Sequence, residues 1–332
     1  MATFLIRRLL LMIPTLFVIS IITFTIIQLP PGDYLTTYIA NLQETGEDAD
    51  EAVIASLRAR YGLDRPLYVQ YGMWIKNILL HGDFGQSFSM GKPVKELIWE
   101  RLGLTVAISL FTIIVTWCIA IPIGIYSATH QYKISDYVFT FFGFIGMATP
   151  GFTVALLVMY FAFACLGTSV GGLFSDEFAA APWTFAKVVD LMKHIWIPVA
   201  ILGVAGTAGL IRTMRANLLD QLEMPYVITA RAKGVSETRL LLKYPVRVAI
   251  NPLVSTIGWM LPQLVSGSVI VAMVLSLPTV GPLLLRALTE QDMYLAGTII
   301  LMVSLLTVIG TLVSDILLAW VDPRIRFERQ KS

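Results

Sequence analysis

The hydrophobic positions of this chain are gathered into long uncharged segments that shorter polar segments separate. The first uncharged segment is Leu9–Leu29, which directly follows Arg7 and Arg8. A helix of about 20 residues crosses the hydrocarbon core of a bilayer, so this segment predicts a first membrane-spanning helix. It is longer than the apolar core of a signal peptide and no small-residue cleavage site follows it, so we expect it to be retained.

Five more apolar segments predict further spans. They are Leu102–Thr129, Tyr137–Leu166, Ile195–Ile211, Leu253–Leu277 and Ala296–Val321. The fold class predicted from this pattern is all-α: a polytopic membrane protein with about six transmembrane helices, an extracytoplasmic segment after the first helix and a cytoplasmic loop before the fifth. Composition agrees, because 56% of the residues are hydrophobic and only 14% are charged, whereas soluble domains carry roughly a quarter charged residues.

The distribution of basic residues predicts the orientation in the membrane. Arg7 and Arg8, the loop from Arg212 to Arg247, and the end of the chain from Arg324 to Lys331 fall on one side if there are six spans. Basic residues favour the cytoplasmic side, so both termini are expected in the cytoplasm. The predicted parts are residues 1–30 (N-terminus and first helix), 31–101 (outer segment), 102–321 (transmembrane core, with the cytoplasmic loop 212–252) and 322–332 (cytoplasmic tail).

Two spans and the outer segment contain features that break the simple apolar pattern. Ala148-Thr149-Pro150-Gly151 predicts a break in the third span, either a kink that shapes the bundle or a point of contact with a solute. Gly203, Gly206 and Gly209 predict close packing of the fourth span. In the outer segment, Asp64 is expected to cap a helix with an apolar stripe that includes Tyr71 and Trp74. That helix either packs flat on the bundle or forms a rim for a delivery protein.

The polar loop Glu223–Pro252 predicts two short helices. Thr229–Lys233 is expected to be helical and to end at Gly234, since glycine readily adopts the left-handed conformation. Ala230 and Gly234 are small, so we expect one bare side that another protein can approach. Ser236 is expected to cap a second helix whose Leu240, Leu241 and Leu242 turn back to the bilayer. The loop is either a basic segment on anionic lipid or a docking element.

Polar and small residues within the fifth span predict a face that turns away from lipid. This set consists of Ser255, Gly258, Pro262, Gln263 and Ser266, and it either lines a solute pathway or packs against another helix. Asp315 is expected to pair near the inner surface, with an arginine as its partner. Cys118 and Cys165 lie in apolar segments, where packing or lipid contact is expected rather than a disulfide or a metal site.

Several short segments resemble one known family. Tyr226-Val-Ile-Thr-Ala-Arg-Ala-Lys-Gly234 resembles the cytoplasmic loop of the permease subunits of bacterial ABC importers of the dipeptide/oligopeptide/nickel group. The segments that resemble the B-type permease of that group elsewhere are Tyr61–Pro66, Gly82–Gly85, Lys92–Val94, Ser276–Gly281 and Asp322–Arg326. The chain departs from the importer pattern at Ile228-Thr229, at Tyr244–Arg247 and at Thr279, where glycine is usual.

The resemblance implies a transmembrane subunit of an ATP-driven importer in the bacterial inner membrane. It implies a small solute delivered by a periplasmic binding protein, most commonly di- or oligopeptides, with oligosaccharides or nickel as alternatives. The implied partners are a second homologous permease, two ABC ATPase subunits, the binding protein and membrane lipid. The positions that would contact the ATPase are Tyr226, Thr229, Ala230, Arg231, Lys233 and Gly234. Neither catalytic residues nor a metal or cofactor are expected on this chain, with ATP and Mg²⁺ on the partner subunits.

The rival hypothesis is a self-sufficient secondary transporter or channel whose basic loop anchors it to lipid. Such proteins place ionisable residues near the middle of the membrane, and here only Asp315 lies well inside a span. The sequence contains neither the Gly-x4-Gly-Lys-Ser/Thr segment of a P-loop nor the His-Glu-x-x-His of a zinc protease. An intramembrane enzyme is therefore disfavoured, and the nature of the solute stays open.

Overall fold

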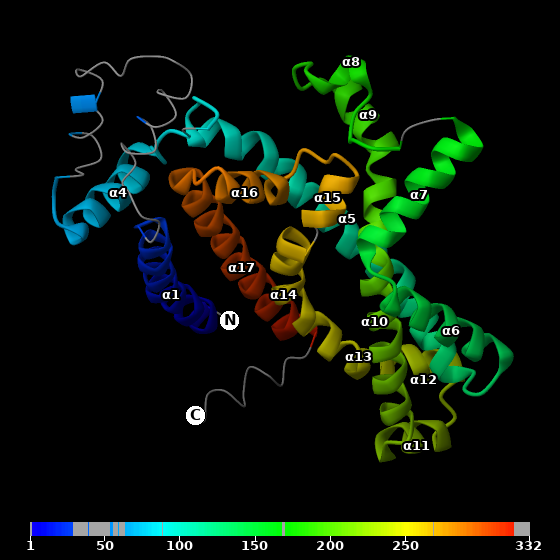
Figure 1. Cartoon of the computed structure of the whole chain (residues 1–332). Helices are drawn as coiled ribbons and strands as arrows, with labels where there is room; N and C mark the ends of the chain where they lie inside the picture. Colours follow the sequence, from blue (N-terminus) through cyan, green and yellow to red (C-terminus); the bar gives the residue numbers. More distant parts are fainter. Residues whose placement is uncertain are drawn as a thin grey trace. The chain divides into compact units, whose positions relative to one another are not determined.

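The computed structural model describes residues 2–28, 64–87, 89–167, 170–267 and 269–321, together with the single positions 39, 54, 55 and 59. These residues form helices and no strand (Figure 1), which confirms the predicted all-α class. Contacts divide the chain into two compact units. One comprises Met1–Arg8, Thr105–Pro278 and Leu306–Ser332, and the other comprises Leu9–Leu104 and Thr279–Leu305. The predicted tail from Asp322 onward lies outside the described residues.

Within the part of the chain that the structure describes, four helices are long and apolar enough to cross a membrane. They are α1 (Ala2–Gln28), α5 (Val94–Thr129), α10 (Trp196–Leu222) and α17 (Met293–Val321). A fifth span results if α6 (Ile134–Ala148) and α7 (Gly151–Leu166) are counted together, although they meet at an angle of 99°. The expected span Leu253–Leu277 is divided into α14 (Asn251–Gly267), with 17 residues, and α15 (Val269–Val274). Six spans therefore stay a prediction.

The break between α6 and α7 occurs where the sequence predicted it. Pro150 has no N–H group, so the carbonyl of Gly146 loses its intrahelical donor. The N–H and the hydroxyl of Thr149 both donate to the carbonyl of Ile145, at 3.0 and 2.8 Å, and close the end of α6. The backbone of Pro150 then begins α7. The bend is much sharper than a kink within one continuous helix.

In the second unit, α4 (Leu67–His81) packs on the later half of α1 through the predicted aromatic stripe. The rings of Tyr71 and Phe24 are 5.5 Å apart, and those of Trp74 and Phe24 are 5.8 Å apart. The hydroxyls of Tyr71 and Ser20 share a hydrogen bond of 2.7 Å. The N-cap of α4 is Pro66, so the prediction that Asp64 caps this helix was wrong.

Asp292 holds together the segments of the second unit that lie on either side of α5. It precedes α17 and follows α16 (Val280–Thr289), a helix that the sequence did not predict. Its buried carboxylate accepts hydrogen bonds from the Ser87 hydroxyl, at 2.5 Å, and from the Ser89 hydroxyl, at 3.2 Å. The N–H of Val94 donates to the carbonyl of Gly85 at 3.0 Å. Thus the segments Gly82–Gly85 and Lys92–Val94 fold back on each other.

The first unit has its core between α5, α10, α13 (Pro245–Ala249) and α14. Met214 and Leu218 of α10 are fully buried there. Two of the three glycines of the predicted packing helix lie close to α5: a Cβ on Gly203 would be 3.1 Å from the Thr116 hydroxyl, and one on Gly206 would be 3.7 Å from the Thr116 methyl group. The packing role is therefore confirmed for these two positions, while the space beside Gly209 is open.

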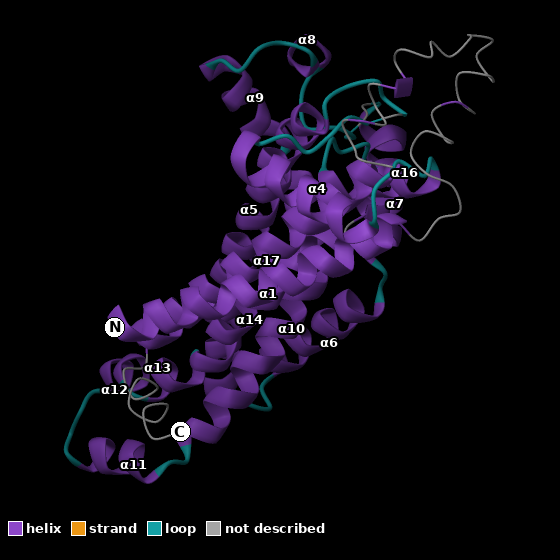
Figure 2. Cartoon of the chain, turned by 90° about the vertical axis from the view of Figure 1, so that its left-hand side faces the viewer, coloured by secondary structure: helices purple, strands orange, loops and turns teal. Residues whose placement is uncertain are grey.

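Helix α10 is longer than the sequence indicated, because it continues from the expected inner boundary at Ile211 to Leu222. Short helices lie beyond both of its ends, as both views in Figures 1 and 2 show. One end carries α8 (Asp176–Ala179) and α9 (Phe185–His194), neither of which was predicted. The other end carries α11 (Pro225–Ala232) and α12 (Glu237–Lys243).

Candidate functional site

The first candidate site is the α11–α12 hairpin, Pro225–Lys243, which follows the end of α10. Proline is favoured at the first position of a helix, because its missing N–H needs no partner there, and Pro225 begins α11. The helix ends at Ala232, and Gly234, two residues later, has a φ of +78°. The N–H of Val235 donates to the carbonyl of Ala230 at 3.3 Å, and the N–H of Gly234 donates to that of Arg231 at 3.0 Å. This pair of bonds is the Schellman arrangement that favours glycine.

The inner side of the hairpin is a small apolar cluster. Val227 and Leu240 are fully buried and Ala230 is 8% exposed, with Val235 and Tyr244 packed around them. Two predictions were therefore wrong. Ala230 packs against α12 and presents no bare side outward, and Leu240 turns toward α11 instead of the bilayer. Leu242 is exposed, and Ser236 occupies the N-cap position of α12 without a capping bond from its side chain.

The outer side of the hairpin carries the other predicted contact residues. Tyr226, Thr229, Lys233 and Gly234 are exposed, and so is Arg231. The Tyr226 hydroxyl donates to the Gln221 side chain at 2.8 Å, and the Thr229 hydroxyl donates to the carbonyl of Pro225 at 2.8 Å. Ile228 is also exposed, at 57%, although the sequence reasoning did not select it. An apolar side chain between polar ones on a short exposed helix suits contact with another protein.

An ion pair fixes the two helices of the hairpin on their outer side. The guanidinium of Arg231 donates to both carboxylate oxygens of Glu237, at 2.7 and 3.1 Å. These hydrogen bonds lower the pKa of Glu237 and raise that of Arg231. Both groups are solvated, so the pair orients the side chains more than it stabilises the fold. Lys233 is also exposed, close in sequence to Arg231.

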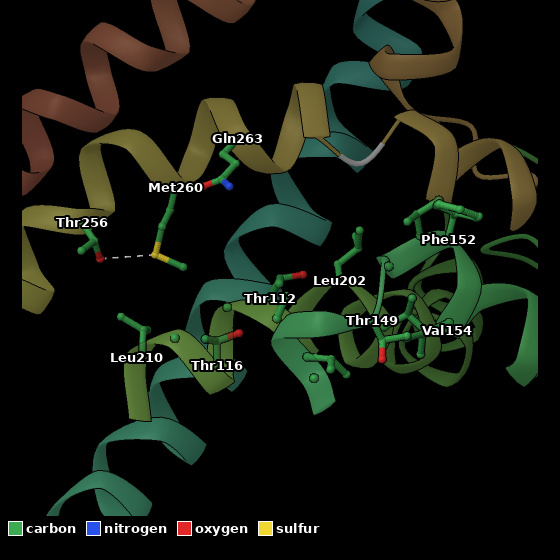
Figure 3. Close-up of a pocket in the computed structure, with 18 of the residues that line it drawn as sticks. Thr112, Thr116, Thr149, Phe152, Val154, Leu202, Leu210, Thr256, Met260 and Gln263 are labelled. Carbon is green, nitrogen blue, oxygen red and sulfur yellow. Dashed lines mark hydrogen bonds between the residues drawn. The ribbon is translucent and has the colours of Figure 1, made fainter. Parts of the chain in front are cut away.

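The second candidate site is a cavity of about 470 Å³ in the first unit. It lies at the break between α6 and α7 and is lined also by α5, α10, α14 and α15. Figure 3 shows Met260 and Gln263 projecting from α14 toward the side where Thr112 and Thr116 of α5 lie. Thr112 is buried, and its hydroxyl has no hydrogen-bond partner. A buried hydroxyl that borders a cavity can bond to a molecule within it.

The structure separates the five residues of the fifth span that the sequence proposed as possible pathway lining. Gln263 lines the cavity. Gly258 packs against α17, because a Cβ there would be 3.2 Å from the Cα of Thr311. The Ser255 hydroxyl donates to the carbonyl of Asn251 at 3.3 Å and is exposed. Pro262 and Ser266 belong to α14, but their side chains lie outside the described residues.

Sequence reasoning missed the ion pair between Asp136 of α6 and Arg215 of α10. The Nε and Nη2 atoms of Arg215 each lie 2.8 Å from a different carboxylate oxygen of Asp136. The two residues are 79 positions apart, so no local spacing pairs them. The sequence contained one signal, the basic residue Arg215, which follows the expected end of the fourth span. The structure shows that α10 continues past it.

Two family models together match most of the chain. Residues 120–327 match the family described as "Binding-protein-dependent transport system inner membrane component", and residues 1–109 match the N-terminal family model of such membrane components. The chain belongs to this family. Members are membrane subunits of ABC importers and are not themselves enzymes, since ATP hydrolysis takes place on separate subunits.

Relatives in this family are similar along nearly the full chain. The "Oligopeptide transport system permease protein AppB" of Bacillus subtilis is 36% identical over 98% of this chain and all of its own length. The "Dipeptide transport system permease protein DppB" of Alkalihalophilus pseudofirmus is 31% identical over 98% of this chain and all of its own. The "Glutathione transport system permease protein GsiC" of Salmonella choleraesuis is 32% identical over 99% of this chain and all of its own.

Proposed function

We propose that this family member is the permease subunit through which an ABC importer moves di- or oligopeptides across the bacterial inner membrane. The observation that carries the proposal is similarity over nearly the full chain to relatives whose names specify oligopeptide, dipeptide and glutathione transport. A periplasmic binding protein delivers the solute, and a second homologous permease and two ATPase subunits complete the complex. Both termini face the cytoplasm, in agreement with the positions of the basic residues.

The α11–α12 hairpin is proposed to dock on an ATPase subunit. Its apolar cluster makes it a compact body, and its outer side presents Tyr226, Ile228 and Arg231 to a partner. Ile228→Asp places a charge on this surface without touching the cluster, so the ATPase subunits should no longer co-purify with the permease. Arg239→Gln, on the exposed side of α12, is the matched control and should leave co-purification unchanged. Equal recovery of the ATPase with both variants would contradict the docking role.

Gly234 offers a second test of the same surface. No atom lies within 4 Å of a Cβ built on Gly234, so the first atom of a side chain there meets no neighbour within the hairpin. Gly234→Trp therefore acts by straining the helix end and by filling the space that a partner would occupy. The complex should assemble poorly or hydrolyse ATP without uptake. Normal uptake with normal ATPase coupling would count against the proposal.

The cavity at the α6–α7 break is proposed to be part of the wall along which the solute passes. Gln263 and Thr149 line it with polar groups, beside apolar side chains such as Phe152. This mixture suits a peptide chain, whose amide groups need hydrogen bonds while many of its side chains are apolar. The proposed pathway wall also includes the other residues predicted from the sequence, which are Ser255, Gly258, Pro262 and Ser266. Of these, Gly258 is better explained by packing on α17.

The experiment that tests the proposed function is ATPase activity of the reconstituted complex. The binding protein is loaded in turn with tri-alanine, with a maltose-type oligosaccharide and with Ni²⁺. Stimulation by the peptide alone supports the proposal, and stimulation by another solute shows a different cargo for the same machinery. If no co-encoded ATPase hydrolyses ATP in the complex, the importer proposal fails and a self-sufficient secondary transporter or channel becomes the better hypothesis.

A further inference from the structure

Helices α6 and α10 lie antiparallel and close together. A Cβ on Gly146 would be 3.0 Å from a methyl carbon of Val204, and one on Gly143 would be 4.0 Å from the Cβ of Ala208. Small residues therefore let the two helices approach each other along their length. Such packing has no directional bonds, so by itself it does not prevent one helix from sliding along the other.

The Asp136–Arg215 ion pair supplies directional bonds at one end of this helix pair. The guanidinium fork of Arg215 binds both oxygens of the Asp136 carboxylate, each at 2.8 Å. The same carboxylate accepts hydrogen bonds from the hydroxyl of Ser127, on α5, and from the N–H of Tyr132, at 3.1 Å. The Asp136 side chain is 4% exposed and that of Arg215 is 26% exposed. A bidentate, largely buried pair of this kind fixes both distance and orientation.

The ion pair lies between the two candidate sites. From Arg215, α10 continues for about 10 Å, at 1.5 Å per residue, to its end at Leu222, where the α11–α12 hairpin begins. From Asp136, α6 runs for about 18 Å by the same rise to its end at Ala148, beside the break that lines the cavity. A displacement of the Leu222 end of α10 thus reaches α6 through Asp136, as well as reaching the cavity through the residues of α10 that line it, such as Thr213.

We propose that Asp136 and Arg215 are positioning residues that make α6 and α10 move as one body during transport. Movement of the docked hairpin would then shift the break at Thr149-Pro150, and with it the cavity wall. This inference rests on the proposed importer function. Without the ion pair, the hairpin and α10 would still follow the ATPase, but α6 would slide on its glycines and the cavity would not change in step.

A purely structural role makes a different prediction. In that case the pair only closes the turn between α5 and α6, and its loss lowers the amount of assembled complex. Uptake and ATP hydrolysis would then fall by the same factor, and the number of solute molecules transported per ATP would stay constant. The ratio of uptake to ATP hydrolysis therefore separates a positioning role from a structural one.

The test uses the complete complex, with binding protein and ATPase subunits, in liposomes. The variants are Asp136→Asn, which removes the charge at nearly constant size, Arg215→Lys, which keeps the charge but loses the fork, and the exchange Asp136→Arg/Arg215→Asp. Arg212→Gln is the matched control, because Arg212 is an exposed residue of the same helix. Uptake of labelled tri-alanine and release of phosphate are measured per assembled complex.

The expected result is that Asp136→Asn and Arg215→Lys retain at least half of the ATP hydrolysis while the solute transported per ATP falls at least tenfold. The exchange should restore part of that ratio, and Arg212→Gln should keep the wild-type ratio. An unchanged ratio in Arg215→Lys, the mildest variant, overturns the inference even if the other variants fail to assemble. Failure of the proposed function is distinguished by the wild-type complex, whose ATPase activity tri-alanine would then not stimulate. In that case the ratio of uptake to ATP hydrolysis is measured with the solute that does stimulate it.

Discussion

Arg8 and Asp315 bind each other across nearly the whole length of the sequence. The Nη2 atom of Arg8, near the start of α1, lies 2.8 Å from one carboxylate oxygen of Asp315 in α17 and 2.7 Å from the other. The sequence analysis expected an arginine partner for this acid, and the structure confirms it. The pair ties the first residues of the chain to the last described helix. It also explains how an acid is accommodated in a spanning helix.

Removing one partner of this pair should destabilise the protein. The Asp315 side chain is 13% exposed and that of Arg8 is 30% exposed. Because the arginine is partly exposed, we expect a loss below the 3–5 kcal/mol typical of buried pairs, about 1–2 kcal/mol, for Asp315→Asn. Thermal unfolding in detergent would measure it. The double variant Arg8→Gln/Asp315→Asn should lose less than the sum of the single losses, and strict additivity would show that the two groups do not interact.

A close contact between α5 and α10 predicts a strong effect of one methyl group. A Cβ on Gly124 would lie 2.7 Å from the Cβ of Met214, which is fully buried and cannot move aside. Gly124→Ala should therefore destabilise the protein by about 1–3 kcal/mol through overpacking. Gly103→Ala is the matched control in the same helix, because nothing lies within 4 Å of its Cβ. Equal melting temperatures for the two variants would refute the close contact.

Local chemistry explains which features could be predicted from the sequence. Pro150 lacks the N–H that would continue α6, and Gly234 readily adopts the left-handed conformation at a helix end, so both breaks were located correctly. The length of the apolar segments likewise predicted most of the long helices. α10 was underestimated because Arg212 and Arg215 were taken as its boundary, although a helix continues past charged residues when a partner or solvent accommodates them.

Features that depend on distant partners were not predictable in the same way. Asp136 and Arg215 meet only because α6 folds back along α10, which no spacing in the sequence specifies. Ala230 was expected outside because it is small, but in α11 it lies on the same side as Val227, three residues earlier, and this side packs on Leu240. The cavity could not be foreseen either, because residues of six helices of the first unit, α5, α6, α7, α10, α14 and α15, line it.

Asp292 should be important for the fold of the second unit. It is 1% exposed and accepts hydrogen bonds from Ser87 and Ser89, and from the N–H of Leu295 at 3.3 Å. Asp292→Ala leaves these buried donors without an acceptor and should cost about 1–3 kcal/mol for each one that water cannot reach. Faster proteolytic cleavage between residues 82 and 94 would report the loss. The control variant Glu100→Gln, at an exposed site on α5, should be cleaved by the protease at the wild-type rate.

The helix end at Gly234 predicts a graded series of variants. The position is open to solvent but has a φ of +78°, so the cost of a side chain is conformational and not steric. Gly234→Ala should cost about 1 kcal/mol, and Gly234→Asn should cost less, because asparagine tolerates this conformation better. Binding of the ATPase subunits to each variant, measured by titration, should follow the same order. Weaker binding by the asparagine variant than by the alanine variant would contradict this account.

The wall of the cavity has a consequence for what it can distinguish. Each described side chain that lines it is uncharged, and the polar ones are threonine hydroxyls and the amide of Gln263. Dipoles of this kind bond to neutral amide groups but do not compensate a full charge that has left its hydration shell. If a solute passes along this wall, as proposed above, a lysine-rich and a glutamate-rich solute of equal size would meet it on equal terms. In that case the wall selects by shape and width, and discrimination by the sign of charge takes place before a solute reaches it.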